Sequence, residues 1–171
     1  MNQPMILVHM KQKTNRLSLL SLLALLAGAF FFSIASHAGP ASEDHAAWMT
    51  DFDAAKAKAS TENKPMLVDF TGSDWCGWCI KLDGEVFSKQ AFKDYAKENL
   101  ILVEIDFPRE KAQSTELKAQ NEALAKKYGV RGFPTILIIN ADGEVIEQTG
   151  YRRGGPEKYI EHLKGILAGV E

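Results

Sequence analysis

The stretch LVDFTGSDWCGWCIKL, residues 67–82, decides the fold because it joins a strand to the only two cysteines of the chain. The segment MLVDF at 66–70 is apolar and follows a proline, which is typical of a buried strand, and Gly72 ends it. Cys76 then begins a helix that is predicted to run to about residue 84, with Cys79 one turn further along. A C-x-x-C pair between a strand and a helix indicates a redox-active site.

Other uses of such a pair fit the sequence less well. A c-type haem needs a histidine directly after the second cysteine, and Ile80 stands there. A structural zinc needs four ligands, whereas only His45 and His162 remain beyond residue 38, at opposite ends of the chain. A disulfide that closes so short a loop stabilises a fold little. At a helix N-terminus, however, the dipole and free N–H groups favour the thiolate of Cys76, and Cys79 can attack a mixed disulfide formed there.

The rest of the chain predicts alternating helices and strands. A strand–helix–strand start favours parallel neighbours, and a late hairpin at Asp142-Gly143 adds antiparallel strands. We expect Thr50 and Ser88 to cap two of the helices. The fold class is therefore α/β, a three-layer sandwich with a mixed central sheet and helices on both faces. The predicted helices cover 50–63, 76–84, 88–99, 115–129 and 155–169, and the predicted strands cover 66–70, 100–107, 134–140 and 144–150.

The N-terminus has the order of a secretory signal. A basic cluster at 11–16 precedes an uncharged apolar run at 17–35, and small residues follow it. We expect a signal peptide over 1–38 and periplasmic or secreted localisation. An uncleaved membrane anchor stays open, because the run has 19 residues and a bilayer span needs about 20. Met1 and Met10 are both possible initiators.

Residues 39–47 are predicted to be a flexible lead-in, and residues 48–171 a single domain. Beyond residue 38 the chain has 17 basic and 22 acidic residues, a formal charge of −5. This balance argues against nucleic acid or an anionic membrane surface as a partner. Export would also place the cysteines where disulfides persist.

Two quoted motifs together resemble a known family. LVDFTGSDWCGWCIKL and the later GVRGFPTILIINADGEVIEQTGY, at 129–151, are similar in order and spacing to the thioredoxin family, over roughly residues 48–170. The nearest resemblance is to secreted bacterial thioredoxin-like proteins and the C-terminal domains of thiol:disulfide interchange proteins. It implies an oxidoreductase that acts on protein thiols and disulfides, with a redox partner that recycles the dithiol and with no cofactor or metal. We expect a monomer that acts as a reductant, while the oxidative direction stays open. Two alternatives stay open: a non-catalytic binding or folding module, and a single-client reductase for cytochrome c maturation.

The resemblance also assigns roles at the catalytic centre. Cys76 corresponds to the exposed nucleophile and Cys79 to the buried resolving thiol, and the two form the disulfide. Asp69 corresponds to a buried acid beneath them, which can take the proton of Cys79 if burial raises its pKa. Pro134 corresponds to a cis-proline, beside which Phe133 can offer its backbone to a substrate.

Substrate contacts are further expected at Trp75, Gly77, Trp78 and Gly150. The sequence departs from the family at three points. The TGSD loop has one extra residue before Cys76, Gly77-Trp78 replaces Gly-Pro, and Glu104 stands on the central strand where a lysine is common. We expect Glu104 to face solvent. We expect Arg152 and Arg153 either to rim the substrate groove or to be solvated loop charges.

Overall fold

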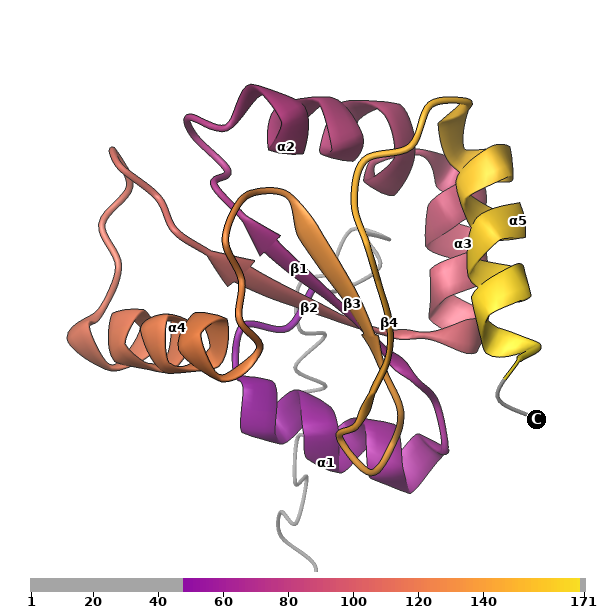
Figure 1. Ribbon diagram of the computed structural model, residues 1–171, viewed down its shortest axis with the longest axis horizontal. Coiled ribbons are helices and arrows are strands. Elements are labelled where there is room, and N and C mark those ends of the chain that lie inside the picture. Colours follow the sequence, from indigo (N-terminus) through magenta and orange to yellow (C-terminus); the bar gives the residue numbers. More distant parts are fainter. Residues whose placement is uncertain (1–47, 170–171) are drawn as a thin grey trace, which may run out of the picture. The chain divides into compact units, whose positions relative to one another are not determined.

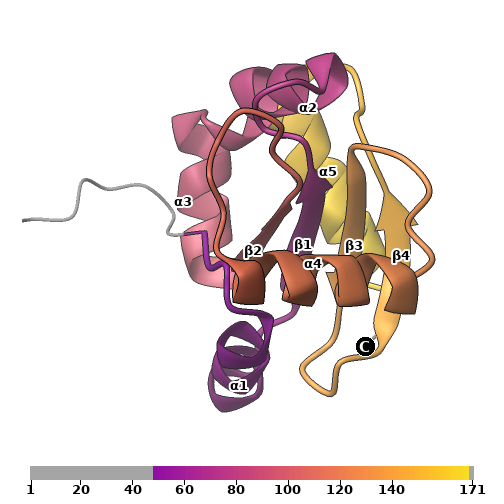
Figure 2. The same cartoon turned by 90° about the vertical axis from the view of Figure 1, so that its left-hand side faces the viewer.

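Helices cover both faces of one mixed sheet in the computed structural model, which describes residues 48–169 (Figures 1 and 2). The predicted signal peptide and lead-in, residues 1–47, lie outside the described residues. The order of helices and strands is the predicted one, with a π-helix added. The elements are α1 (Phe52–Glu62), β1 (Met66–Thr71), α2 (Gly77–Leu82), η1 (Asp83–Phe87), α3 (Gln90–Asn99), β2 (Ile101–Asp106), α4 (Thr115–Lys127), β3 (Thr135–Ile139), β4 (Val145–Thr149) and α5 (Gly155–Leu167).

The sheet has the strand order β2-β1-β3-β4. As predicted, β1 and β2 are parallel, and β3 and β4 form an antiparallel hairpin. Strand β3 also runs antiparallel to β1. Met49 lies along the other side of β2, where its N–H donates to the carbonyl of Leu102 and its carbonyl accepts from the N–H of Glu104, both at 2.9 Å. The sheet is thus extended at the β2 edge by a short segment before α1.

Alternate residues of the buried strands pack into two hydrophobic clusters, one on each face. One cluster joins α1 and α4 to the sheet, with Phe70 and Val103 among its strand residues. The other joins α2, η1, α3 and α5 to the opposite face, with Leu67 and Leu102 among its strand residues. Figure 2 shows α4 crossing one face while α5 lies behind the strands. Because side chains alternate along a strand, Asp69 lies on the same face of β1 as Leu67, under α2.

Two of the predicted helix caps are wrong. The cap of α1 is Asp51 rather than Thr50, and its carboxylate accepts the N–H of Ala54 at 2.9 Å. Ser88 does not cap α3, because the helix begins at Gln90, after Lys89. Instead, the turn after α2 widens into η1, which buries two apolar residues and includes Ser88 in its last hydrogen bond, to the carbonyl of Asp83.

Candidate active site

Cys76 caps the N-terminus of α2 and forms a disulfide with Cys79. Its backbone is extended, with φ −83° and ψ 103°, and its sulfur accepts the N–H of Cys79 at 3.2 Å. The two Cα atoms are 5.2 Å apart across the bond. A sulfur in the capping position faces the free N–H groups of the first turn, which stabilise negative charge on it. The geometry therefore favours a thiolate at Cys76 when the bond is reduced.

The expectation that Cys76 is exposed is wrong for this disulfide form. Its exposed fraction is 7%, against 4% for Cys79, so both side chains are buried. The side chain of Cys76 is buried because residues distant in sequence pack beside it. Access to Cys76 runs through a cavity of about 390 Å³, which we call the Cys76 groove. It is lined by Trp75, Cys76, Ala125, Val130, Arg131, Gly132 and Phe133.

The Phe133–Pro134 peptide bond is cis, as the family resemblance implies. Phe133 lines the Cys76 groove, so this bond lies at the edge of the groove. Gly150 approaches the same segment from β4, since a Cβ at Gly150 would lie 3.3 Å from the carbonyl oxygen of Pro134. A side chain at Gly150 would therefore be in tight contact with the proline backbone, and the glycine avoids that contact.

Asp69 is buried on the face covered by α2 and η1. Within the described residues, its Oδ1 atom has no hydrogen-bond partner. Burial raises the pKa of Asp69 well above its ordinary value, and the negative charges of Glu104, Asp83 and Asp106 raise it further. A carboxyl group of this kind is a stronger base than an ordinary aspartate, so it can accept a proton and return it.

Glu104 is half-buried, so the expectation that it faces solvent is wrong. The register of β1 and β2 places Glu104 opposite Asp69, on the same face of the sheet as Asp69. Burial raises the pKa of Glu104, the charge of Asp106 raises it further, and Lys111 lowers it. Asp69 and Glu104 are therefore neighbouring carboxyl groups, and the charge of Glu104 disfavours ionisation of Asp69.

The TGSD loop makes a set of contacts that the sequence did not predict. The carboxylate of Asp74 accepts the N–H groups of Arg109, Glu110 and Lys111 at 2.8–3.1 Å. Ser73 is also hydrogen-bonded to the end of β2, because its N–H and hydroxyl both donate to Asp106, at 2.9 and 2.6 Å. The loop before the cysteines is thereby fastened to the loop after β2. The extra residue in TGSD was the only sequence signal, and it carries no information about a partner 35 residues away.

Trp75 is held between these two loops. Its indole Nε1 donates to the carbonyl of Phe107 at 2.7 Å, and the guanidinium of Arg109 lies 3.8 Å from its ring centroid. Phe133 meets the ring edge-on, with centroids 5.9 Å apart. The indole also folds back over Gly72, where a Cβ would approach it to 2.6 Å. Trp75 thus forms a fixed wall beside Cys76.

Trp78 lies on the open surface of α2 and is 53% exposed. Its ring contacts Tyr151, with centroids 5.2 Å apart, and the ammonium of Lys81 lies 5.4 Å from both rings. The hydroxyl of Tyr151 donates to Glu85 at 2.7 Å. Gly77, next to Trp78, is exposed as well. These residues form a second aromatic surface, separate from the wall at Trp75.

The remaining candidates lie away from the Cys76 groove. Arg152 and Arg153 are exposed and line a shallow cavity with Lys158, Glu161 and His162. His162 is half-buried, and its Nε2 is 3.0 Å from the hydroxyl of Thr149. The structure therefore does not bring the arginine pair to the groove.

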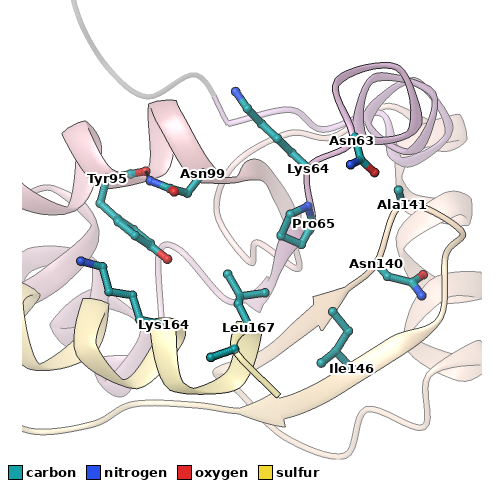
Figure 3. A pocket seen from close by; sticks show the side chains of 11 residues that line it. Asn63, Lys64, Pro65, Tyr95, Asn99, Asn140, Ala141, Ile146, Lys164 and Leu167 are labelled. Carbon is teal, nitrogen blue, oxygen red and sulfur yellow. Dashed lines mark hydrogen bonds between the residues drawn. The ribbon is translucent and has the colours of Figure 1, made fainter. Parts of the chain in front are cut away.

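A larger cavity, of about 540 Å³, lies near the start of β1, whereas the cysteines follow the end of that strand (Figure 3). In Figure 3, Tyr95 and Lys164 point toward one another across it. None of the predicted site residues lines this cavity. Its lining residues are Asn63, Lys64, Pro65, Tyr95, Asn99, Asn140, Ala141, Ile146, Lys164, Leu167 and Ala168.

The fold, the capping cysteine and the cis-proline define the thioredoxin-like class of protein, which includes thiol:disulfide oxidoreductases. The chain belongs to the thioredoxin-like domain family, whose model matches residues 52–165. It is 38% identical over 106 residues to the disulfide bond reductase DsbH of Chlamydia pneumoniae, which covers 62% of this chain and 64% of that protein. It is 27% identical over 113 residues to the thiol:disulfide interchange protein DsbD of Yersinia enterocolitica, covering 64% of this chain and 18% of that protein.

Solved structures agree with this assignment. A structure of a DsbH oxidoreductase matches with a TM-score of 0.68 at 34% identity, covering 71% of this chain and 84% of that chain. The reduced C-terminal domain of DsbD from Neisseria meningitidis matches with a TM-score of 0.50 at 25% identity, covering 66% and 91%. The match spans less than two thirds of the length of both DsbH and DsbD among the curated relatives.

Proposed function

We propose that the protein is an exported thiol:disulfide oxidoreductase that reduces disulfides in protein clients through Cys76 and Cys79. The observation that carries this proposal is the position of Cys76 as the cap of α2, where its sulfur accepts the N–H of Cys79. The name of the 38%-identical relative, a disulfide bond reductase, supports the reductive direction. Export is supported by the basic, apolar and small residues of the predicted signal, 1–38. Among residues 48–169, no helix is both long and apolar enough to cross a membrane.

The reaction begins with both cysteines reduced. The Cys76 thiolate attacks one sulfur of the client disulfide, forming a mixed disulfide and releasing the other client sulfur as a thiolate. Cys79 then attacks the Cys76 sulfur, which frees the second client thiolate and forms the Cys76–Cys79 bond. Two electrons pass from the protein to the client. A further redox partner must return them before the next turnover.

Asp69 is proposed to accept the proton of Cys79 before the second attack. Cys79 is almost fully buried, so its thiol needs a base that is also buried. Asp69 lies under α2 with an oxygen that has no hydrogen-bond partner among the described residues, and its raised pKa makes it a stronger base than an ordinary aspartate. Trp75, Gly77, Trp78, Phe133, Pro134 and Gly150 are proposed to contact the client around the cysteines.

Insulin reduction tests the activity. Wild type is expected to reduce insulin with dithiothreitol as electron source, while Cys76→Ala and the double variant with Cys79→Ala are expected to be inactive. Wild type no faster than the double variant would contradict catalysis. That outcome would favour a non-catalytic binding or folding module.

Client trapping tests the range of substrates. Cys79→Ser removes the resolving thiol, so the mixed disulfide at Cys76 should accumulate. Recovery of many different clients is expected. Recovery of one client alone, for example an apocytochrome, would favour a single-client reductase.

Redox titration against glutathione tests the direction. A reductant should have a potential near that of thioredoxin, about −270 mV, whereas an oxidant should lie near about −120 mV. A value at the oxidising end would overturn the reductive direction and leave the oxidoreductase assignment in place.

A further inference from the structure

One arginine lines the Cys76 groove and a second stacks on a residue that lines it, and neither takes part in the redox step. Arg131 lines the groove together with Trp75 and Phe133. Arg109 stacks its guanidinium on the Trp75 ring, 3.8 Å from the centroid. Both side chains are exposed, and none of the described residues that line the groove is acidic. A client entering the groove therefore meets a lining that carries positive charge and no carboxylate. The Asp74 carboxylate, bound to the N–H groups of the Arg109 loop, lies outside that lining.

The position of Arg109 is fixed by Asp74. Three successive N–H groups, of residues 109, 110 and 111, converge on the Asp74 carboxylate at 2.8–3.1 Å. Such a run of N–H groups forms a concave site for an anion, and here the protein supplies the anion itself. These hydrogen bonds lower the pKa of Asp74, so its carboxylate stays ionised and bound. The loop is thereby prevented from carrying Arg109 away from Trp75.

The segment of chain that contains both arginines also carries a net positive charge. Residues 107–134, which include both arginines and α4, contain six basic and three acidic residues. Residues 48–169 as a whole contain 17 basic and 19 acidic residues. Positive charge is thus concentrated in the segment that forms one side of the groove, within a domain that is slightly acidic. Such an asymmetry attracts acidic partners to that side.

We propose that the Cys76 groove selects client segments that carry Asp or Glu beside the target cysteine. Arg109 and Arg131 are the specificity-determining residues, because a guanidinium binds a carboxylate through paired hydrogen bonds. Asp74 is a positioning residue that acts through Arg109. This inference rests on the proposed function, since it concerns the clients of the same cysteine pair.

Three matched peptides test the proposal. Each contains one intramolecular disulfide, and the residues flanking its cysteines are Glu, Gln or Lys. The reduced protein is mixed with each peptide in single turnover, and chromatography follows the conversion of the peptide disulfide to a dithiol while Cys76–Cys79 becomes oxidised. Wild type is expected to reduce the Glu peptide about tenfold faster than the Lys peptide at low salt, and the ratio should shrink as salt is added.

Substitutions locate the preference. Arg109→Gln and Arg131→Gln should each lower the Glu-to-Lys rate ratio about two- to fivefold, and Arg131→Glu should reverse it. The matched control is Lys118→Gln, which removes one cation from α4 without touching the groove, and it should leave the ratio unchanged. Asp74→Asn also removes a negative charge, so its effect through Arg109 is measured as the difference between its effects in wild type and in Arg109→Gln, and it should lower the ratio more in wild type. A ratio cancels any change in the reactivity of Cys76 itself.

The outcomes separate the two proposals. Failure to reduce any peptide would contradict the oxidoreductase assignment. Equal rates for the Glu and Lys peptides, or a faster Lys peptide, would overturn the acidic preference while leaving that assignment intact. A ratio that falls equally in Lys118→Gln would assign the preference to overall charge and overturn the role of the groove.

Discussion

The two tryptophans of the cysteine motif, Trp75 before Cys76 and Trp78 between the two cysteines, have opposite environments. Trp75 is held by a hydrogen bond to Phe107, by stacked Arg109 and by the edge of Phe133. Trp78, three residues later, lies on the open face of α2, against Tyr151. The difference shows that the Trp75 side of the site is packed into the fold, whereas the Trp78 side is an exposed surface of α2. Changes at Trp75 should therefore affect stability, and changes at Trp78 should leave it almost intact.

The largest effect is expected for Trp75→Ala. The substitution removes the indole hydrogen bond and the contacts with Phe133 and Arg109, so the free energy of unfolding should fall by about 2–4 kcal/mol. Guanidinium chloride denaturation of the oxidised protein measures it. Trp75→Phe is the control, because it keeps a ring and loses the donor, and it should cost about 1 kcal/mol. If Trp75→Ala lowered the free energy of unfolding no more than Trp75→Phe, packing of the indole would not stabilise this side of the site.

Asp69→Asn tests the buried carboxyl group beneath α2. The substitution should stabilise the oxidised protein. Because the pKa of Asp69 is raised in the fold, ionisation opposes folding above the ordinary value of 3.8. The gain should be absent below that pH, grow as the pH rises toward the folded pKa, and then stay constant. Denaturation curves between pH 3 and pH 9 measure it. A gain independent of pH would contradict a charge effect.

Asp74→Asn should have the opposite pH dependence and a smaller effect. The pKa of Asp74 is lowered in the fold by backbone N–H groups, so its ionised form stabilises the folded state above the ordinary value of 3.8. The substitution should lower the unfolding midpoint at neutral pH, and the difference should disappear as the pH falls below 3.8 toward the folded pKa. Thermal unfolding at pH 7 and at pH 3 measures it. An equal loss at both pH values would point to a packing defect instead.

The smallest effect on stability is expected for Trp78→Ala. More than half of the Trp78 side chain is exposed, so the free energy of unfolding should change by no more than about 0.5 kcal/mol. The same denaturation experiment as for Trp75→Ala measures it. If Trp78→Ala cost as much as Trp75→Ala, the contrast between the two sides would be lost.

The fold could be predicted from local patterns. The apolar strands, the breaks at Gly72 and Asp142-Gly143, and the strand–helix–strand order are properties of short windows, and they determined the mixed sheet. The cap at Cys76 also followed from its place between a strand and a helix. The π-helix η1 was missed because it continues the hydrogen bonding of α2 in a different register, which no local pattern encodes.

The surroundings of the cysteines could be predicted only in part. The burial of Asp69 was implied by the family resemblance and agrees with its place in an apolar strand, whereas the half-burial of Glu104 depends on the pairing of β1 with β2. The burial of Cys76 depends on residues 125–133, which come to it only through the tertiary fold. The partners of Asp74 are backbone N–H groups, and any residue except proline supplies one. Their identity therefore leaves no trace in the sequence.

The segment at Met49 has a consequence for association between molecules. A free strand edge is a template on which another chain can add a strand. Met49 occupies part of the β2 edge, while β4, at the other edge, is only five residues long, carries Glu147, and is interrupted where Ile146 has no partner in the register. Short, charged and irregular edges resist such pairing. The described domain is thus protected against edge-to-edge aggregation.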